Sequence, residues 1–372
     1  MPIIVRGIGP KRRRMDGRGP QSSLLRVECH KIIEQGKAMA VSFGLILPNR
    51  AVILGAVTVR DLFDLAAQGE ASGAFDTLWV GDSLLAKPRL ESVTLLSALA
   101  AITTRVRLGV GCMATFAHRH PVLLAQQWAS LDVLSHGRSW LVVCLGGPNE
   151  AGAAQALEHT AMGIQARERI GRLEEGMVIL RKLFHDQQVS HHGRFYQFDG
   201  LTLQPSPVQD PCPIWIASNP TGLTWRGGAS ASETVIERSF RRVARYADGW
   251  MTNKVTPEQF GQQWGRITTM AREEGRDAAQ LSNALYHNIN INEDRQAALV
   301  ESKTFLDTYY TANFSPAFVE GWTAAGTPKQ CIEEFQAYFN AGVQHVSLRL
   351  TSWDQRGQLK RFLHEVAPAF AA

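Results

Sequence analysis

A strand, an irregular connection and a helix follow one another in residues 105–138, the unit from which parallel α/β proteins are built. Apolar and polar side chains alternate over 105–110, as in a strand, and Pro121 then opens a stretch of helical spacing that ends at Gly137. Parallel α/β proteins carry their chemistry at the carboxyl ends of the strands. We therefore expect a functional site at the connection GCMATFAHRH and at LGGPNE, which ends the next strand.

The same alternation of strand and helix patterns runs from Met39 to the end of the chain. Short apolar runs predict eight strands, at 41–47, 75–81, 105–112, 139–146, 213–218, 248–253, 284–292 and 344–351. Helical spacing predicts eight helices, at 59–72, 91–103, 121–136, 166–185, 233–247, 257–275, 295–310 and 328–341. Eight such pairs without a linker favour one (βα)8 TIM barrel with insertions. A doubly wound sheet is the competing fold, but no predicted strand precedes a dinucleotide-binding glycine motif.

Two longer segments interrupt the repeat. Residues 186–212 predict a β-hairpin followed by a proline-rich return to the barrel. Residues 218–232 are rich in glycine and lead into a helix whose start carries a capping box, Ser230 with Glu233. Long loops at strand ends usually bind ligands or close over them.

The positive charge of the chain is concentrated at its start. Of 39 basic and 34 acidic residues, residues 1–40 hold nine and three, which leaves 30 basic and 31 acidic residues in the remainder. The near-neutral remainder does not favour a nucleic-acid partner. We expect residues 1–38 to be a poorly ordered basic extension, with a transit peptide or a basic arm as alternatives, and 39–372 to be one domain.

The five cysteines are far apart and form no CxxC pair. This pattern favours a reducing compartment, the cytoplasm, with neither a disulfide framework nor a metal site. No apolar run is long enough to cross a membrane, so we expect no membrane association.

The residues at the predicted strand ends are the candidate site. They are Asp82, Ser83, Cys112, Met113, Gly146, Gly147, Ser218, Asn219, Asn253, Lys254, Asn290 and Arg349. The set lacks paired carboxylates at glycosidase spacing, a GxSxG nucleophile elbow and an HExxH motif. Its small residues suit a flat ring lying against backbone, such as a flavin, better than they suit hydrolysis.

Several candidates have a structural alternative. For Asp82 and Ser83 the alternatives are a turn cap and a hydrogen bond to a cofactor. His118 belongs either to a solvated loop or to a substrate-facing one. Cys112 is more typical of a small core residue than of a reactive thiol.

Ser230 and Ser232 precede a predicted helix, whose first N–H groups and positive dipole end suit an anion. The alternatives there are a phosphate site and a plain helix cap. Arg226 and three nearby glycines favour phosphate binding in this loop.

The chain resembles the bacterial luciferase-like flavin-dependent oxidoreductases. The resemblance covers roughly residues 41 to 350 and rests on these segments in family order: GAFDTLWVGDSLL at 73–85, LAAITTRVRLGVGCM at 99–113, HPVLLAQQWASLDVLSHGRSWLVVCLGG at 120–147, RERIGRLEEGMVILRKLF at 167–184, HGRFYQF at 192–198, LQPSPVQDPCPIWIASNP at 203–220 and ADGWMTNKVTPEQF at 247–260. It implies a TIM barrel that binds reduced FMN or, in a sister branch, the deazaflavin coenzyme F420. It is specific for fold and cofactor type, and it leaves the substrate open.

The resemblance also implies roles for single residues. A non-prolyl cis peptide is expected at Gly111–Cys112, as a backrest for the central ring of the cofactor. Asp82 would face that ring. The remaining implied contacts are Gly146 and Gly147 at the ribityl chain or ring edge, and Ser218 and Asn219 at the phosphate, alone or with Ser230 and Ser232.

One position departs from the family pattern. Several members carry a histidine directly after the aspartate that ends the second strand, where this chain has Ser83. His118 is the nearest substitute in the sequence. We therefore take His118 and Ser83 as the candidate catalytic residues, and a mechanism that needs the family histidine is in doubt.

The leading hypothesis for function is a monooxygenase that uses reduced FMN and oxygen on a small organic substrate. A separate reductase would supply the flavin, because the chain shows no nicotinamide motif of its own. The alternatives are an F420-dependent oxidoreductase that transfers hydride and a non-catalytic flavin-binding barrel. Family habit favours a homodimer or a homotetramer.

Overall fold

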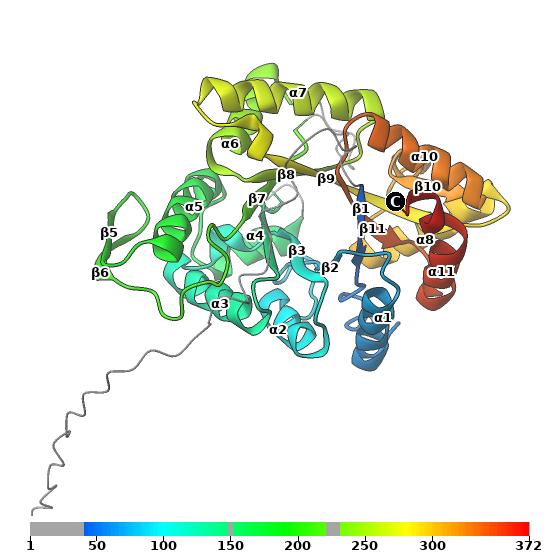
Figure 1. Ribbon diagram of the computed structural model, residues 1–372, viewed down its shortest axis with the longest axis horizontal. Coiled ribbons are helices and arrows are strands. Elements are labelled where there is room, and N and C mark those ends of the chain that lie inside the picture. The colour runs from blue at the N-terminus through cyan, green and yellow to red at the C-terminus, as the bar shows by residue number, and fades with distance from the viewer. Residues whose placement is uncertain (1–40, 148–151, 221–230, 372) are drawn as a thin grey trace, which may run out of the picture. The chain divides into compact units, whose positions relative to one another are not determined.

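The computed structural model describes residues 41–147, 152–220 and 231–371. Its core is a closed barrel of eight parallel strands, joined edge to edge because the last strand pairs with the first (Figure 1). The strands are β1 (Ser42–Ile46), β2 (Thr77–Val80), β3 (Arg107–Met113), β4 (Ser139–Val143), β7 (Ile214–Ala217), β8 (Gly249–Asn253), β9 (Ser282–Ile291) and β11 (His345–Leu350). The predicted TIM barrel is confirmed.

Helices surround the strands, and all eight predicted helices are present. They are α1 (Val59–Ala71), α2 (Ser92–Ile102), α3 (Pro121–Leu134), α5 (Arg169–His185), α6 (Glu233–Tyr246), α7 (Pro257–Glu273), α8 (Arg295–Tyr310) and α10 (Pro328–Asn340). The helices α1, α7 and α10 begin with capping boxes at Thr58, Thr256 and Thr327, which explains their sharp starts.

Among the described residues, three α-helices and one strand were not predicted: α4 (Ala153–Ala161), α9 (Pro316–Glu320), β10 (Thr323–Gly326) and α11 (Gln355–Arg361). The strand β10 adds to the sheet beside the second half of β9, with Asn288 opposite Thr323. Its sequence, TAAG, is too short and too poor in branched residues to indicate a strand.

The predicted hairpin insertion is confirmed as β5 (Val189–His192) and β6 (Gln197–Leu201). Its return to the barrel is held by Asp132, a fully buried carboxylate on α3. The backbone N–H groups of Val208 and Gln209 donate to it at 2.7 and 2.9 Å.

Apolar side chains fill the barrel interior as well as the space between strands and helices. The inner cluster holds three tryptophans, with Trp140 4.9 Å from Trp79 and 4.6 Å from Trp215 between ring centroids. Glycine at 109 makes room for them, since a Cβ there would lie 2.2 Å from the Trp79 ring. Trp250, which also lies on a barrel strand, packs in the outer layer between strands and helices. The filled interior leaves space only where the strands end.

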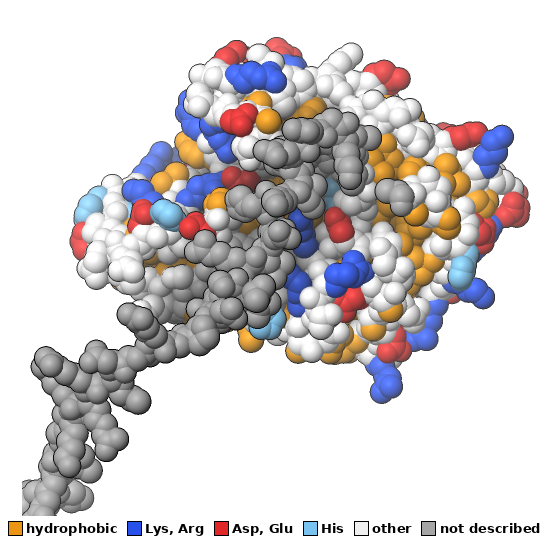
Figure 2. Space-filling view, viewed as in Figure 1, with side chains coloured by type: hydrophobic (Ala, Val, Ile, Leu, Met, Phe, Trp, Pro, Cys, Tyr) orange, Lys and Arg blue, Asp and Glu red, His pale blue; other side chains and the backbone are white. Residues whose placement is uncertain are grey.

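On the face in Figure 2, acidic and basic side chains are interspersed over the described surface. Within the described ranges no helix is both long and apolar enough to cross a membrane. The predicted basic extension 1–38 and most of the glycine-rich loop, including Ser230 and Arg226, lie outside the described residues.

Candidate functional site

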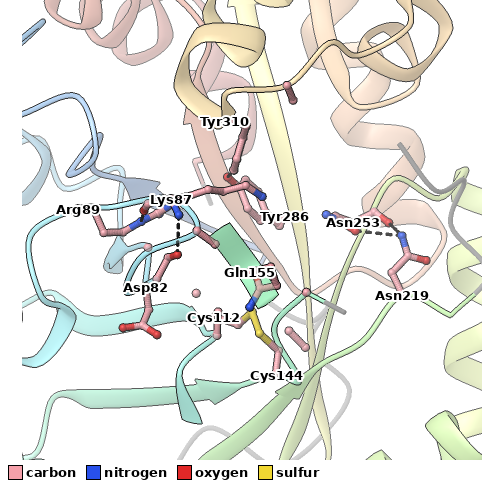
Figure 3. Close-up of a pocket in the computed structure, with 18 of the residues that line it drawn as sticks. Asp82, Lys87, Arg89, Cys112, Cys144, Gln155, Asn219, Asn253, Tyr286 and Tyr310 are labelled. Carbon is pink, nitrogen blue, oxygen red and sulfur yellow. Dashed lines mark hydrogen bonds between the residues drawn. A yellow bond between two sulfur atoms is a disulfide. The ribbon is translucent and has the colours of Figure 1, made fainter. Parts of the chain in front are cut away.

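A cavity of about 780 Å³ opens at the carboxyl ends of the barrel strands. Figure 3 shows Asp82 and Arg89 on one side of it, Asn219 and Asn253 on the other, and the two cysteines at its base. This volume lies in the usual range of 300–1,000 Å³ for ligand sites.

The cavity brings together most of the predicted site residues. Those that line it are Asp82, Ser83, Gly111, Cys112, Gly147, Ser218, Asn219, Asn253 and Arg349. His118, Gly146 and Ser232 are not part of the lining. Ser232 is the N-cap residue of α6, but its side chain makes no capping hydrogen bond.

The backbone at the end of β3 has the form that the resemblance implies. The Gly111–Cys112 peptide bond is cis, although its second residue is cysteine and not proline. The register with β4 shifts between Gly111 and Met113, so Cys112 is the extra residue of a β-bulge. The bulge turns Cys112 toward the inner cluster and the cavity.

The expectation that the cysteines form no disulfide was wrong. Cys112 and Cys144 are joined, with their Cα atoms 5.9 Å apart. The two residues are 32 positions apart in the sequence, and only the parallel pairing of β3 with β4 brings them together. Cys112 is therefore more than a small core residue.

Asp82 organises one wall of the cavity. Its carboxylate is 8% exposed and accepts hydrogen bonds from the Ser92 hydroxyl at 2.8 Å and from both the N–H and the hydroxyl of Thr115, at 2.8 and 2.7 Å. Arg119 adds an ion pair at 3.2 Å. Asp82 therefore ties the end of β2 to α2 and to the loop after β3. Ser83 beside it accepts from the Lys87 N–H at 3.0 Å, which is a turn contact.

Gly146 does not line the cavity, but it packs against the loop residues that do. The loop after β4 is clamped by Arg169 on α5, which donates to the carbonyl oxygens of Leu145, Gly146 and Gly147 at 3.0, 3.2 and 2.8 Å. Gly146 has a φ of +66°, and a Cβ on it would lie 2.7 Å from the carbonyl oxygen of Ala114. Both features require glycine.

Gly146→Ala is expected to lower the free energy of unfolding by about 2–3 kcal/mol. Gly163→Ala is the matched control, because Gly163 has nearly the same φ, +65°, and no atom within 4 Å of its Cβ position. It should cost only the left-handed backbone term of about 1 kcal/mol. Urea unfolding of both variants measures the difference, and equal losses would contradict the contact with Ala114.

His118, predicted as a catalytic residue, does not face the cavity. It ends a short 3₁₀ turn (Phe116–His118) that buries its side chain to 1% exposure, since the turn folds back under α4. Its Nδ1 lies 3.6 Å from the Glu158 carboxylate, and its ring packs 5.1 Å from that of His159. A role in contact with substrate is inconsistent with this position.

The buried imidazoles predict a pH dependence of stability. Burial lowers the pKa of His118, against the opposing charge of Glu158, and burial also lowers the pKa of His159. The unfolded chain therefore binds more protons below the usual histidine pKa of about 6.5, and stability should fall as the pH drops from 7 toward 5. His118→Gln should flatten this slope, whereas His192→Gln, at a 65% exposed side chain, should leave it unchanged.

Sequence reasoning missed the tyrosines that surround Arg349. Arg349 is 4% exposed and donates to the Tyr310 hydroxyl at 2.7 Å, which also bonds to the Tyr286 hydroxyl at 2.8 Å. Its guanidinium lies 4.4 Å from the centre of the Tyr309 ring. Burial opposes the charge, but these tyrosines outweigh it and raise the pKa of Arg349. Among the described residues no carboxylate pairs with this cation, so its charge is available to the cavity.

The lining has more positive than negative side chains. Lys87, Arg89 and Arg349 are basic, and Asp82 is the one acidic side chain among the described lining residues. The Lys87 Nζ lies 5.1 Å from the centre of the Tyr310 ring. Lys254, also at a strand end, instead donates to the carbonyl oxygen of Phe318 at 3.0 Å. The cavity therefore suits an anionic ligand.

The lining fits a flavin or deazaflavin ring with a phosphate-bearing tail. Small residues form much of the lining and leave room for a ring: Gly81, Gly111, Ala114, Gly147, Ala153 and Ala217. The Asn219 amide nitrogen donates to the Asn253 side chain at 2.9 Å, while its buried Oδ1 has no partner among the described residues. An unpaired acceptor in a binding cavity is typical of a group that bonds to its ligand.

The chain is similar to known proteins along most of its length. The chain is 23% identical over 333 residues to an F420-dependent glucose-6-phosphate dehydrogenase of Kineococcus radiotolerans, covering 82% of this chain and 92% of the relative. Its fold is similar to an F420-dependent secondary alcohol dehydrogenase in complex with an F420-acetone adduct (TM-score 0.74, 18% identity, 90% of this chain and 100% of that one). A monooxygenase from Streptomyces bottropensis is also similar (TM-score 0.72, 22% identity, 89% and 100%).

The family model described as luciferase-like monooxygenase matches residues 41–345. This span includes every barrel strand from β1 to β9 and every predicted cofactor residue. The chain therefore belongs to the luciferase-like monooxygenase family.

Proposed function

We propose that this protein is an F420-dependent oxidoreductase that acts on a small molecule carrying a hydroxyl or carbonyl group and an anionic group. The observation that carries the proposal is the buried, carboxylate-free Arg349 beside the Tyr310 hydroxyl, in a cavity whose base is the cis Gly111–Cys112 peptide. The curated relatives are F420-dependent dehydrogenases, which supports F420 over the reduced FMN of the leading sequence hypothesis.

The residues present would hold the cofactor between two sides of the cavity. The ring would lie against Gly111 and Cys112, and Ser218 and Asn219 would bind the phosphate end. When bound, the cofactor supplies a hydride donor or acceptor. The basic Lys87 and Arg89 favour the negative charge of the cofactor or of the substrate.

Tyr310 would move the proton at the substrate oxygen. Its hydroxyl is at the cavity, and the Arg349 Nη1 at 2.7 Å stabilises the negative charge that the phenolic oxygen carries when the proton is away. In this proposal the acid-base group belongs to α8, and the proton transfer requires neither Ser83 nor His118 nor the family histidine.

An anaerobic assay with oxidised F420 tests this function. Phosphorylated sugars and hydroxy acids should bleach the cofactor, with kcat/KM at least tenfold above that for neutral alcohols of similar size. Bleaching by neutral alcohols alone would contradict the anionic substrate. Consumption of oxygen with reduced FMN and an organic substrate would instead support the monooxygenase hypothesis.

Oligomeric state stays a prediction. Sedimentation of the purified protein should give a homodimer or homotetramer. A monomer would contradict this.

A further inference from the structure

The Cys112–Cys144 disulfide is built into the base of the cavity. Cys112 is the bulged residue of β3 and packs against the inner cluster. Val142 belongs to the inner cluster and Val143 to the outer one, so the alternation along β4 points Cys144 inward. Both cysteines are half-buried and line the cavity, as the yellow bond in Figure 3 shows.

The other described cysteines are not disulfide-bonded and do not line the cavity. Cys212 and Cys331 are thiols buried between the barrel and its helices, away from the cavity. Burial raises the pKa of each to about 12, which keeps it protonated and unreactive. Within the described residues, the cysteine side chains at the cavity are those of the disulfide pair alone.

The disulfide adds little to the order of the chain around it. The strands β3 and β4 are already paired in parallel up to Gly111 with Val142 and Met113 with Val143, on either side of Cys112. A covalent bond between segments that a ladder already aligns is not needed to bring them together. Its position in the lining instead exposes both sulfur atoms to a ligand bound in the cavity.

We propose that Cys112 and Cys144 form a redox centre that exchanges two electrons with the reduced deazaflavin or flavin bound in this cavity. The proposal rests on the proposed cofactor site. In the reduction, the S–S bond breaks and two S–H bonds form. The cysteines gain two electrons and two protons, and the dihydro cofactor loses the same two electrons and two protons. No further co-reactant is required.

Mass spectrometry of the full-length protein tests the exchange without an activity assay. Trypsin releases Cys112 in peptide 108–119 and Cys144 in peptide 139–167, so the oxidised protein yields these two peptides cross-linked. The protein is mixed anaerobically with one equivalent of chemically reduced F420 or reduced FMN, quenched in acid and alkylated. The cross-linked peptide should be replaced by two alkylated peptides, with one cofactor oxidised per chain.

Two variants and a binding measurement make the outcome decisive. Cys331→Ala, which removes a buried thiol, should behave as the wild type. Cys144→Ser should bind the reduced cofactor, by equilibrium dialysis, and leave it reduced. Dithiothreitol opening the bond in wild type confirms that the bond can be reduced. If F420 binds and the cross-link persists, the redox centre is overturned while the proposed function stands. If neither cofactor binds, both fail.

Discussion

Tyr310→Phe is expected to lower kcat with F420 and the anionic substrate by about 10²–10³-fold. In the proposed function the hydroxyl moves the proton at the substrate oxygen, and general acid-base groups contribute typically 10²–10⁴-fold. The Tyr310 ring and its packing remain, so KM should change less than threefold. Steady-state kinetics over a range of substrate concentrations separates the two constants.

Tyr309→Phe is the matched control for this variant. Tyr309 also packs on Arg349, but its hydroxyl accepts from the Arg50 N–H at 3.2 Å and it does not line the cavity. It should keep kcat within about threefold of the wild type. Equal losses in the two variants would mean that the tyrosine cluster acts through packing, and would contradict proton transfer by Tyr310.

Asp82→Asn is expected to lower the free energy of unfolding by about 3 kcal/mol. The carboxylate accepts four hydrogen bonds, two on each oxygen, from Ser92, Thr115 and Arg119. The amide of asparagine replaces one carboxylate oxygen by an NH2 group, which cannot accept hydrogen bonds. The two donors that bonded to that oxygen are then left without an acceptor in a buried site. The substitution also weakens the ion pair with the half-buried Arg119, which keeps its contact with Glu91 at 2.7 Å. Urea unfolding monitored by tryptophan fluorescence measures the change.

Asp199→Asn on the hairpin serves as the control for Asp82. Its carboxylate pairs with His192 at 2.9 Å, but the side chain is 74% exposed. The change in free energy of unfolding should stay within about 0.5 kcal/mol. A loss at Asp82 that is no larger would show that its contacts do not anchor the cavity wall.

Local periodicity was enough to predict the barrel, because each strand and helix carries its own pattern. The run from Val106 to Val110 alternates as a strand, and Pro121 is the first residue of the following helix, which ends at Leu134, two residues before its predicted end. The cis peptide at Gly111–Cys112 came from the resemblance alone, because no local pattern distinguishes it.

The residues of the candidate site were predictable only where they come directly after the end of a strand in the sequence. Asp82, Ser218 and Asn219 satisfy that rule, whereas Tyr310 ends a helix and comes to the cavity through tertiary packing. The disulfide depends on the register of two strands, and the burial of His118 depends on α4, which was not predicted. These are long-range contacts that a reading of local pattern does not contain.

Equilibrium binding of F420 and FMN to the purified protein tests the central claim most directly. Oxidised F420 should bind with a Kd at least tenfold lower than that of FMN. Ala217→Phe, which fills part of the cavity, should weaken F420 binding at least tenfold. Tighter binding of FMN than of F420, or F420 binding that Ala217→Phe leaves unchanged, would contradict the account.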